Sequence, residues 1–166
     1  MSIRNVNVER LSIVSNQSFD TVVGKLTAAI GRADLQKLAK AGSDGSSYEE
    51  YGRLVRSMVG PSDLFEFLGL DIGAILRKAS GSSAPRSWRF IVGNPLIMQQ
   101  MASHVPDAAS YAPVTILVDE RPDGVHLSYD RMVSLLAPYG DQEALRVADS
   151  LDKKVERLLT AAASKD

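Results

Sequence analysis

Alternation of apolar and polar residues predicts four strands. In Val6 to Ser15, apolar and polar positions alternate in the way that is typical of a half-buried strand. Ser87 to Val92 is an aromatic and β-branched segment, which predicts another strand. Val114 to Asp119 and Val125 to Tyr129 flank a Pro-Asp-Gly turn, so we expect these two strands to form an antiparallel hairpin.

Apolar residues at three-and-four spacing predict helices between and after these strands. One helix follows the cap residue Ser18, and a second begins with a capping box of Ser47 and Glu50. A short helix is predicted over Leu96 to His104. The last helix is long, with Asp141 as its cap. Its apolar stripe consists of Ala144, Val147, Ala148, Leu151, Val155, Leu158, Leu159 and Ala162.

Two segments give a weaker pattern. Gly31 to Ser47 is mostly polar and includes two glycines among serines, so we interpret it as a loop. Leu64 to Leu76 carries too many apolar residues for one narrow stripe and is interrupted by Gly69 and Gly73. Its secondary structure stays ambiguous at this stage, but the sequence predicts that it is buried.

Composition narrows the class of protein. The 166 residues are 45% hydrophobic and 23% charged with a formal net charge of −1, which predicts one globular domain and no nucleic-acid partner. The absence of cysteine excludes disulfides, thiolate metal sites and a cysteine nucleophile. No segment has the apolar length of a membrane span or of a secretion signal, so we expect a soluble, cytoplasmic protein with no membrane partner.

The order of several motifs resembles a known family. These motifs are "ERLSIVSNQSFDTVVGKLTAAI", the strand ending in Gly-Asn-Pro, "SYAPVTILVDERPDGVHLSYD" and "EALRVADSLDKKVERLL". Together they resemble the family called domain of unknown function 302. The likeness covers most of the chain except a helical insertion at about residues 31–85.

The resemblance implies an architecture and no established activity. It implies an α+β fold, similar to the TATA-binding-protein-like folds, in which an antiparallel sheet is backed by helices. It also implies a homodimer. Because fold does not fix function, a function has to be argued from a site.

The corner Gly93-Asn94-Pro95 is the first candidate site. Pro95 suits the first position of a helix, Asn94 can cap that helix, and Gly93 permits a close approach. A structural corner explains all three residues and is favoured. The same helix N-terminus would bind an anion if it were exposed, so Asn94 stays a candidate ligand contact.

Two arginines near this corner could bind a carboxylate or a phosphate. In "PRSWRF", strand alternation places Arg86, Trp88 and Phe90 on one face, and Arg89 on the other. A guanidinium can bind either anion through two parallel hydrogen bonds. The alternative is that Arg86 and Arg89 are solvated or salt-bridged residues at the surface, which is the commoner role.

The hairpin supplies titratable candidates. His126 shares a strand face with Asp130, whereas Tyr129 lies on the opposite face. A histidine beside a carboxylate is the minimum for acid–base chemistry. No HExxH motif, Walker loop, G-x-G-x-x-G or G-x-S-x-G occurs, so we expect no metal and no cofactor.

These observations support three hypotheses. In the first, a small molecule binds between the sheet and the inserted apolar segment, with Arg86, Arg89, Asn94, His126 and Tyr129 as candidate ligand contacts. In the second, the protein acts as a homodimeric interaction or accessory protein without a ligand. In the third, His126 serves a weak acid–base enzyme together with Asp130 or Asp119.

Overall fold

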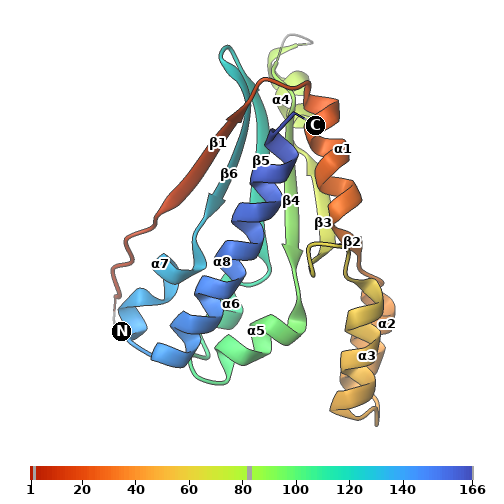
Figure 1. Cartoon of the computed structure of the whole chain (residues 1–166), viewed down its shortest axis with the longest axis vertical. Helices are drawn as coiled ribbons and strands as arrows, with labels where there is room; N and C mark the ends of the chain where they lie inside the picture. Colours follow the sequence, from red (N-terminus) through yellow and green to blue (C-terminus); the bar gives the residue numbers. More distant parts are fainter. Residues whose placement is uncertain (2, 82–83, 166) are drawn as a thin grey trace.

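The computed structural model describes residues 1, 3–81 and 84–165, which form a six-stranded sheet with helices (Figure 1). The strands are β1 (Arg10–Ser15), β2 (Gly31–Arg32), β3 (Phe65–Asp71), β4 (Ser87–Gly93), β5 (Val114–Arg121) and β6 (Gly124–Asp130). The helices are α1 (Phe19–Ala29), α2 (Leu35–Ser43), α3 (Tyr48–Met58), α4 (Ile72–Ser80), α5 (Pro95–Ala102), α6 (Ala108–Tyr111), α7 (Met132–Leu136) and α8 (Gln142–Ala163), with a 3-10 turn at Ala137–Tyr139.

The sheet is mixed, with the strand order β1-β6-β5-β4-β3-β2. All neighbouring strands run antiparallel except β2, which pairs parallel to β3 through two residues. The predicted α+β class is confirmed, and the predicted wholly antiparallel sheet is corrected by this short parallel pair. The likeness to TATA-binding-protein-like folds stays a prediction.

One face of the sheet is covered by α8 and α1, which lie side by side across it (Figure 1). Strand register puts Phe90, Ile116 and Tyr129 next to one another on this face, and each is at most 1% exposed. Burying such a side chain stabilises the fold by about 1.5–3 kcal/mol. The main core therefore lies between the sheet and these helices.

The long helix α8 forms where the sequence predicts it. The carboxylate of Asp141 accepts a hydrogen bond of 2.9 Å from the amide of Ala144, which caps the helix. Most of the predicted apolar stripe is buried against the core. Within the described residues, no helix is both long enough and apolar enough to cross a membrane.

The hairpin and the capping box are confirmed. Strands β5 and β6 pair around a turn at Gly124, where a φ of 141° favours glycine. At the start of α3, the amide of Glu50 donates to the hydroxyl of Ser47, and the amide of Ser47 donates to the Glu50 carboxylate. The first strand is shorter than predicted, because pairing with β6 begins only at Arg10.

Two predictions about the middle of the chain are wrong. The predicted loop at Gly31 to Ser47 contains β2 and α2, which is capped by Asp34 and packs one buried residue, Leu38, against Val55 of α3. Leu64 to Leu76 is a strand followed by the start of a helix, and it is only partly buried. Leu68 is 50% exposed because its side chain lies beside Ile91 on the face of the sheet away from α1 and α8.

The range 31–85 therefore supplies strands as well as helices. Strand β3 joins β4 in the sheet, and Phe65 at its start belongs to a small second core with Leu38 and Val55. That small core holds α2 and α3 to the sheet, where they project beyond its lower end (Figure 1). That this range is an insertion into a single domain stays a prediction.

Candidate functional site

The second face of the sheet, here called the open face, has side chains that remain accessible. Because successive side chains of a strand point to opposite faces of the sheet, one set of side chains faces the helices and the other set faces this side. Across β4, β5, β6 and β1, Arg89 lies opposite Leu117, which lies opposite Ser128, which lies opposite Ser12. The open face includes Arg10, Ser12, Val14, Leu68, Leu70, Arg89, Ile91, Thr115, Leu117, Ser128 and Asp130.

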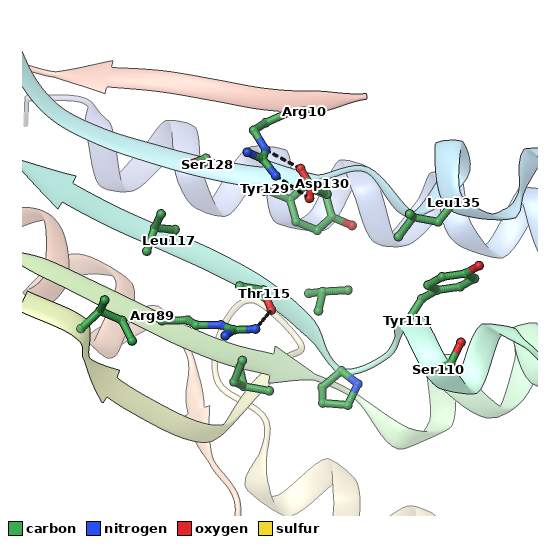
Figure 2. Close-up of a pocket in the computed structure, with 14 residues that line it drawn as sticks. Arg10, Arg89, Ser110, Tyr111, Thr115, Leu117, Ser128, Tyr129, Asp130 and Leu135 are labelled. Atoms are coloured by element: carbon green, nitrogen blue, oxygen red, sulfur yellow. Dashed lines mark hydrogen bonds and ion pairs between the residues drawn. The ribbon is translucent and has the colours of Figure 1, made fainter. Parts of the chain in front are cut away.

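A hollow of about 620 Å³, here called the open-face pocket, lies on this face (Figure 2). Its floor consists of strand side chains from β4, β5 and β6. Helix α6, the start of β5 and helix α7 border one end, and the first residue of α4 also lines it. The lining residues are Arg10, Ile72, Arg89, Ile91, Ser110, Tyr111, Pro113, Val114, Thr115, Leu117, Ser128, Tyr129, Asp130 and Leu135.

Arg10 and Asp130 form a bidentate ion pair on the rim of the pocket. The guanidinium Nε and Nη2 atoms of Arg10 donate to the two carboxylate oxygens at 2.6 and 2.8 Å (Figure 2). These hydrogen bonds, together with the positive charge, lower the pKa of Asp130. Because the carboxylate stays ionised at neutral pH, the charge of Arg10 is neutralised within the protein.

Arg89 has no such partner. Its side chain is exposed, and among the described residues its only hydrogen bond is one of 3.4 Å to the hydroxyl of Thr115 (Figure 2). The pocket therefore has one guanidinium that is not paired with a carboxylate. It lies beside the apolar side chains of Ile91 and Leu117.

Arg86, the second candidate arginine, lies away from the pocket. Its guanidinium donates two hydrogen bonds to the carboxylate of Asp20 and stacks 4.3 Å from the ring centroid of Phe19. Both partners belong to α1, which covers the helix-packed face of the sheet. Arg86 thus links β4 to α1 and does not line the open-face pocket.

Asn94 is the N-cap of α5, as the structural interpretation of the corner predicts. Its side-chain oxygen accepts from the amide of Leu96 at 2.9 Å, and its amide group donates to the carbonyl oxygen of Asp63 at 3.1 Å. Asn94 is 7% exposed, and its hydrogen-bonding groups are occupied by these contacts. Asn94 therefore holds the corner to the turn before β3.

Tyr129 borders the pocket, but its hydroxyl lies in the core. It donates at 2.7 Å to the carboxylate of Asp152, a residue of α8 that is fully buried. The same carboxylate accepts hydrogen bonds from the backbone amides of Met132 and Val133 at the start of α7. Burial raises the pKa of Asp152, and burial beside that carboxylate raises the pKa of Tyr129.

His126 lies on the same sheet face as Asp130, but it pairs with a different carboxylate. Its Nε2 atom is 2.8 Å from Oδ1 of Asp123, in the hairpin turn. Asp119 lies opposite His126 in the register but is paired with Arg121. His126 does not line the open-face pocket, and no metal-binding group of three acidic or histidine residues occurs within the described parts of the chain.

Of the five candidate contacts, the pocket brings together only Arg89 and Tyr129. Sequence reasoning missed Arg10, Thr115, Ser128 and Tyr111, which come from four separate elements. For two of these residues, Arg10 and Ser128, the sequence does contain a signal. In the first strand and in the hairpin, alternation places Arg10 and Ser128 opposite the apolar face, but only strand order shows that these residues meet.

The mixed sheet, covered by helices on one face and accessible on the other, defines an α+β domain with an open sheet. A model of the family described as domain of unknown function DUF302 matches residues 39–162. The chain belongs to the DUF302 family, which confirms the resemblance seen in its sequence.

A solved structure shares the fold. It is the crystal structure of uncharacterized conserved protein DUF302 from Bacillus stearothermophilus, with a TM-score of 0.64 and 9% sequence identity. The match covers 93% of this chain and 98% of that chain. At this identity the likeness concerns the fold alone. A comparison with curated proteins finds no match.

Proposed function

We propose that this protein binds a small amphipathic molecule with a single negative charge in the open-face pocket. The carboxylate of that molecule would accept hydrogen bonds from Arg89. Its apolar part would lie along the strand side chains beside Arg89. The unpaired guanidinium of Arg89 is the observation that carries the proposal.

The charges of the pocket support a monoanion. Arg10 and Asp130 neutralise each other, so the lining residues have one excess positive charge, on Arg89. A guanidinium binds a carboxylate through parallel hydrogen bonds that are stronger than those between neutral groups. One monoanionic group would balance this charge.

The other residues that line the pocket support a ligand whose body is apolar and carries few polar atoms. Ile72, Ile91, Leu117 and Leu135 supply aliphatic surface, and Tyr111 supplies an aromatic ring. The hydroxyls of Ser110, Thr115 and Ser128 add isolated hydrogen-bonding groups. Mostly apolar clefts with a few polar anchors are typical of small-molecule sites. From the predicted apolar segment, only Ile72 contributes.

Native mass spectrometry of the purified protein would first show whether a small molecule is retained. Binding would then be measured with 1-anilinonaphthalene-8-sulfonate, an aromatic monoanion that fluoresces in apolar sites, and by its displacement with octanoate. Octanoate should displace the dye, and 1-octanol, which has the same chain without the charge, should do so much less.

The matched variants are Arg89→Ala and Arg121→Ala. Both remove an exposed guanidinium, but Arg121 is bound to Asp119 in the hairpin and does not line the pocket. Arg89→Ala should weaken octanoate binding by about five- to tenfold, the effect of losing a charge-assisted hydrogen bond. Equal effects of the two variants, or equal displacement by octanol, would refute the proposal.

A second candidate function is assembly of two copies through the open face. Large apolar side chains on or beside this face are exposed, namely Val14, Leu68, Leu70, Ile75 and Leu76. A two-fold dimer would pair this patch with itself, which is the commonest form of assembly. Sedimentation equilibrium over a wide concentration range tests it: a dimer that Leu70→Asp dissociates supports this function, and a monomer throughout excludes it.

A further inference from the structure

The two edges of the sheet differ in how they are protected against pairing with a further strand. At one edge, β2 is only two residues long, and β3 beside it has a bulge between Glu66 and Leu68. Short edge strands and bulges are features by which proteins prevent a free edge from pairing. This edge therefore offers little regular backbone to an added strand.

The opposite edge is β1, which forms the left-hand margin of the sheet in Figure 1. It pairs with β6 over six residues without a register shift, and it contains no proline. Its one charged side chain, that of Arg10, is bound to Asp130 of β6. Within the described residues, no strand pairs with the outer side of β1. This edge strand thus lacks the usual protections.

The hydrogen bonds between β1 and β6 fix which backbone groups of β1 point outward. The carbonyl oxygen of Glu9, the residue before β1, accepts from the amide of Arg131 at 2.9 Å. In an antiparallel pair, consecutive residues alternate between bonding the partner strand and pointing away from it. The N–H and C=O groups of Arg10, Ser12 and Val14 therefore point away from β6, toward the free edge.

We propose that β1 pairs antiparallel with β1 of a second copy of this chain, about a two-fold axis at Ser12. In this register Ser12 lies opposite Ser12, and Arg10 lies opposite Val14. All the outward-pointing residues of one copy then meet those of the other. Each such pair exchanges two hydrogen bonds, so about six would join the copies. Any other register with this alternation leaves Arg10 or Val14 outside the paired strands.

The side chains on the helix-covered face of β1 suit the same register. Leu11 and Ile13 are partly buried at the margin of the main core. The two-fold axis places Leu11 of each copy opposite Ile13 of the other, as a pair without backbone hydrogen bonds, in which side chains lie closest. One segment thus supplies both the backbone groups and the matching apolar side chains, which favours a second copy over an unrelated extended peptide.

This assembly leaves the open face accessible. A two-fold axis perpendicular to the sheet keeps the open faces of both copies on the same side, so this dimer differs from one that buries the open face. Two six-residue strands joined edge to edge bury less than the roughly 1,600 Å² of a typical stable interface. We therefore expect a dissociation constant on the order of 10–100 μM.

The test is sedimentation equilibrium of the full chain and of two variants, Ser12→Lys and Ser12→Asp, from about 1 μM to about 1 mM, which brackets that dissociation constant. Because residue 12 lies opposite itself, like charges meet in each variant, and each alone should dimerise about fivefold more weakly. An equimolar mixture of the two variants should restore dimerisation, because opposite charges then meet. Only a register centred on Ser12 predicts this rescue.

The matched control is Ser57→Lys. Ser57 is exposed on α3, which packs beside the opposite edge of the sheet, so this variant should change dimerisation less than about twofold. Urea unfolding at low concentration shows whether each variant monomer remains folded.

Amide hydrogen exchange of the unmodified chain gives a second readout. The amide of Ser12 points outward, so it should exchange more slowly at about 1 mM than at a concentration well below the dissociation constant. The amide of Ile13 points toward β6, so it should be protected at both concentrations.

The proposal is overturned if the unmodified chain stays monomeric at about 1 mM, well above the expected dissociation constant. It is also overturned if the mixture of Ser12 variants dimerises no better than either variant alone, or if Ser57→Lys weakens dimerisation as much as Ser12→Lys does. Exchange of the Ser12 amide that does not depend on concentration would contradict it as well. A dimer that Leu70→Asp dissociates and that Ser12→Lys leaves intact would place the contact on the open face instead.

Discussion

The hydroxyl of Tyr129 on β6 donates a hydrogen bond of 2.7 Å to the carboxylate of Asp152, which is fully buried on α8. This carboxylate also accepts hydrogen bonds of 2.8 and 3.1 Å from the backbone amides of Met132 and Val133. The guanidinium of Arg131 lies 3.6 Å from it. One polar residue in an apolar helix stripe thus connects the sheet, α7 and α8. Its role is structural.

Asp152→Ala should destabilise the protein far more than Tyr129→Phe. The alanine leaves a buried hydroxyl and two backbone amides without their acceptor, which predicts a loss of about 3–4 kcal/mol. The phenylalanine removes one donor while the amides still bind the carboxylate, which predicts about 1 kcal/mol. Urea unfolding at constant m-value measures both free energies.

The control for this prediction is Asp149→Ala on the same helix. Asp149 pairs with Lys153 at the surface, and such a pair contributes less than about 0.5 kcal/mol. If Asp152→Ala cost no more than Asp149→Ala, the hydrogen bonds around Asp152 would not be those described.

The ion pair of Arg10 and Asp130 predicts the titration of the pocket rim. Hydrogen bonds from Arg10 hold the pKa of Asp130 below its ordinary value of 3.8. The stability that this pair contributes is therefore present above pH 3.8 and is lost as the pH falls through the lowered pKa. Because both side chains are partly exposed, we expect this contribution to be small.

NMR titration of the Asp130 carboxyl group measures this directly. In Arg10→Ala, the pKa should rise toward 3.8, because the donor and the positive charge are both removed. Arg121→Ala removes a cation that is bound to Asp119, so the pKa of Asp130 should stay where it is. An unchanged pKa in Arg10→Ala would mean that the pair does not persist in solution, and the charge balance argued for the pocket would need revision.

Close backbone packing beside β2 predicts an unusual sensitivity at Gly31. A Cβ atom there would overlap the carbonyl oxygen of Met58 and lie 2.5 Å from the amide nitrogen of Gly60. Gly31→Ala should therefore cost more than about 2 kcal/mol, because backbone atoms rather than a flexible side chain would have to move. Thermal or urea unfolding measures this change in the free energy of unfolding.

Gly24 provides the matched control, since it lies within α1 and a Cβ atom there would meet nothing within 4 Å. Gly24→Ala should stabilise the protein by about 0.5–1 kcal/mol, the ordinary difference in helix propensity. If Gly31→Ala were also neutral or stabilising, α3 and β2 could not approach each other as closely as described.

Sequence reasoning succeeded where periodicity and local capping decide the structure. The β5–β6 hairpin and the capping box of α3 follow from residues that are close in the chain. It failed at α2, which is mostly polar and whose single buried residue, Leu38, packs against Val55 of α3. The polar composition of this range outweighed the local cap signal of Asp34, and the burial of Leu38 comes from packing against the next helix.

The same limit applies to burial and to the candidate site. Leu68 and Leu70 were predicted to be buried because they are apolar, but a strand is buried on both faces only if both faces are covered. Arg89 was found because it is polar within a strand. Its neighbours in the pocket come from elements whose adjacency follows from strand order, and alternation within one strand does not supply that order.

The accessibility of the open face can be tested with two leucines of the same sheet. Leu127 on β6 is fully buried under the helices, whereas Leu70 on β3 is 36% exposed on the open face. Leu127→Ala should cost about 2–5 kcal/mol, because it leaves a cavity in the core. In a monomer, Leu70→Ala should cost less than Leu127→Ala, because Leu70 is already partly exposed to solvent. Urea unfolding at two protein concentrations separates the proposed functions. If Leu70→Ala lowered the free energy of unfolding strongly only at the higher concentration, the open face would be buried by a second copy. The pocket would then be occluded in that assembly.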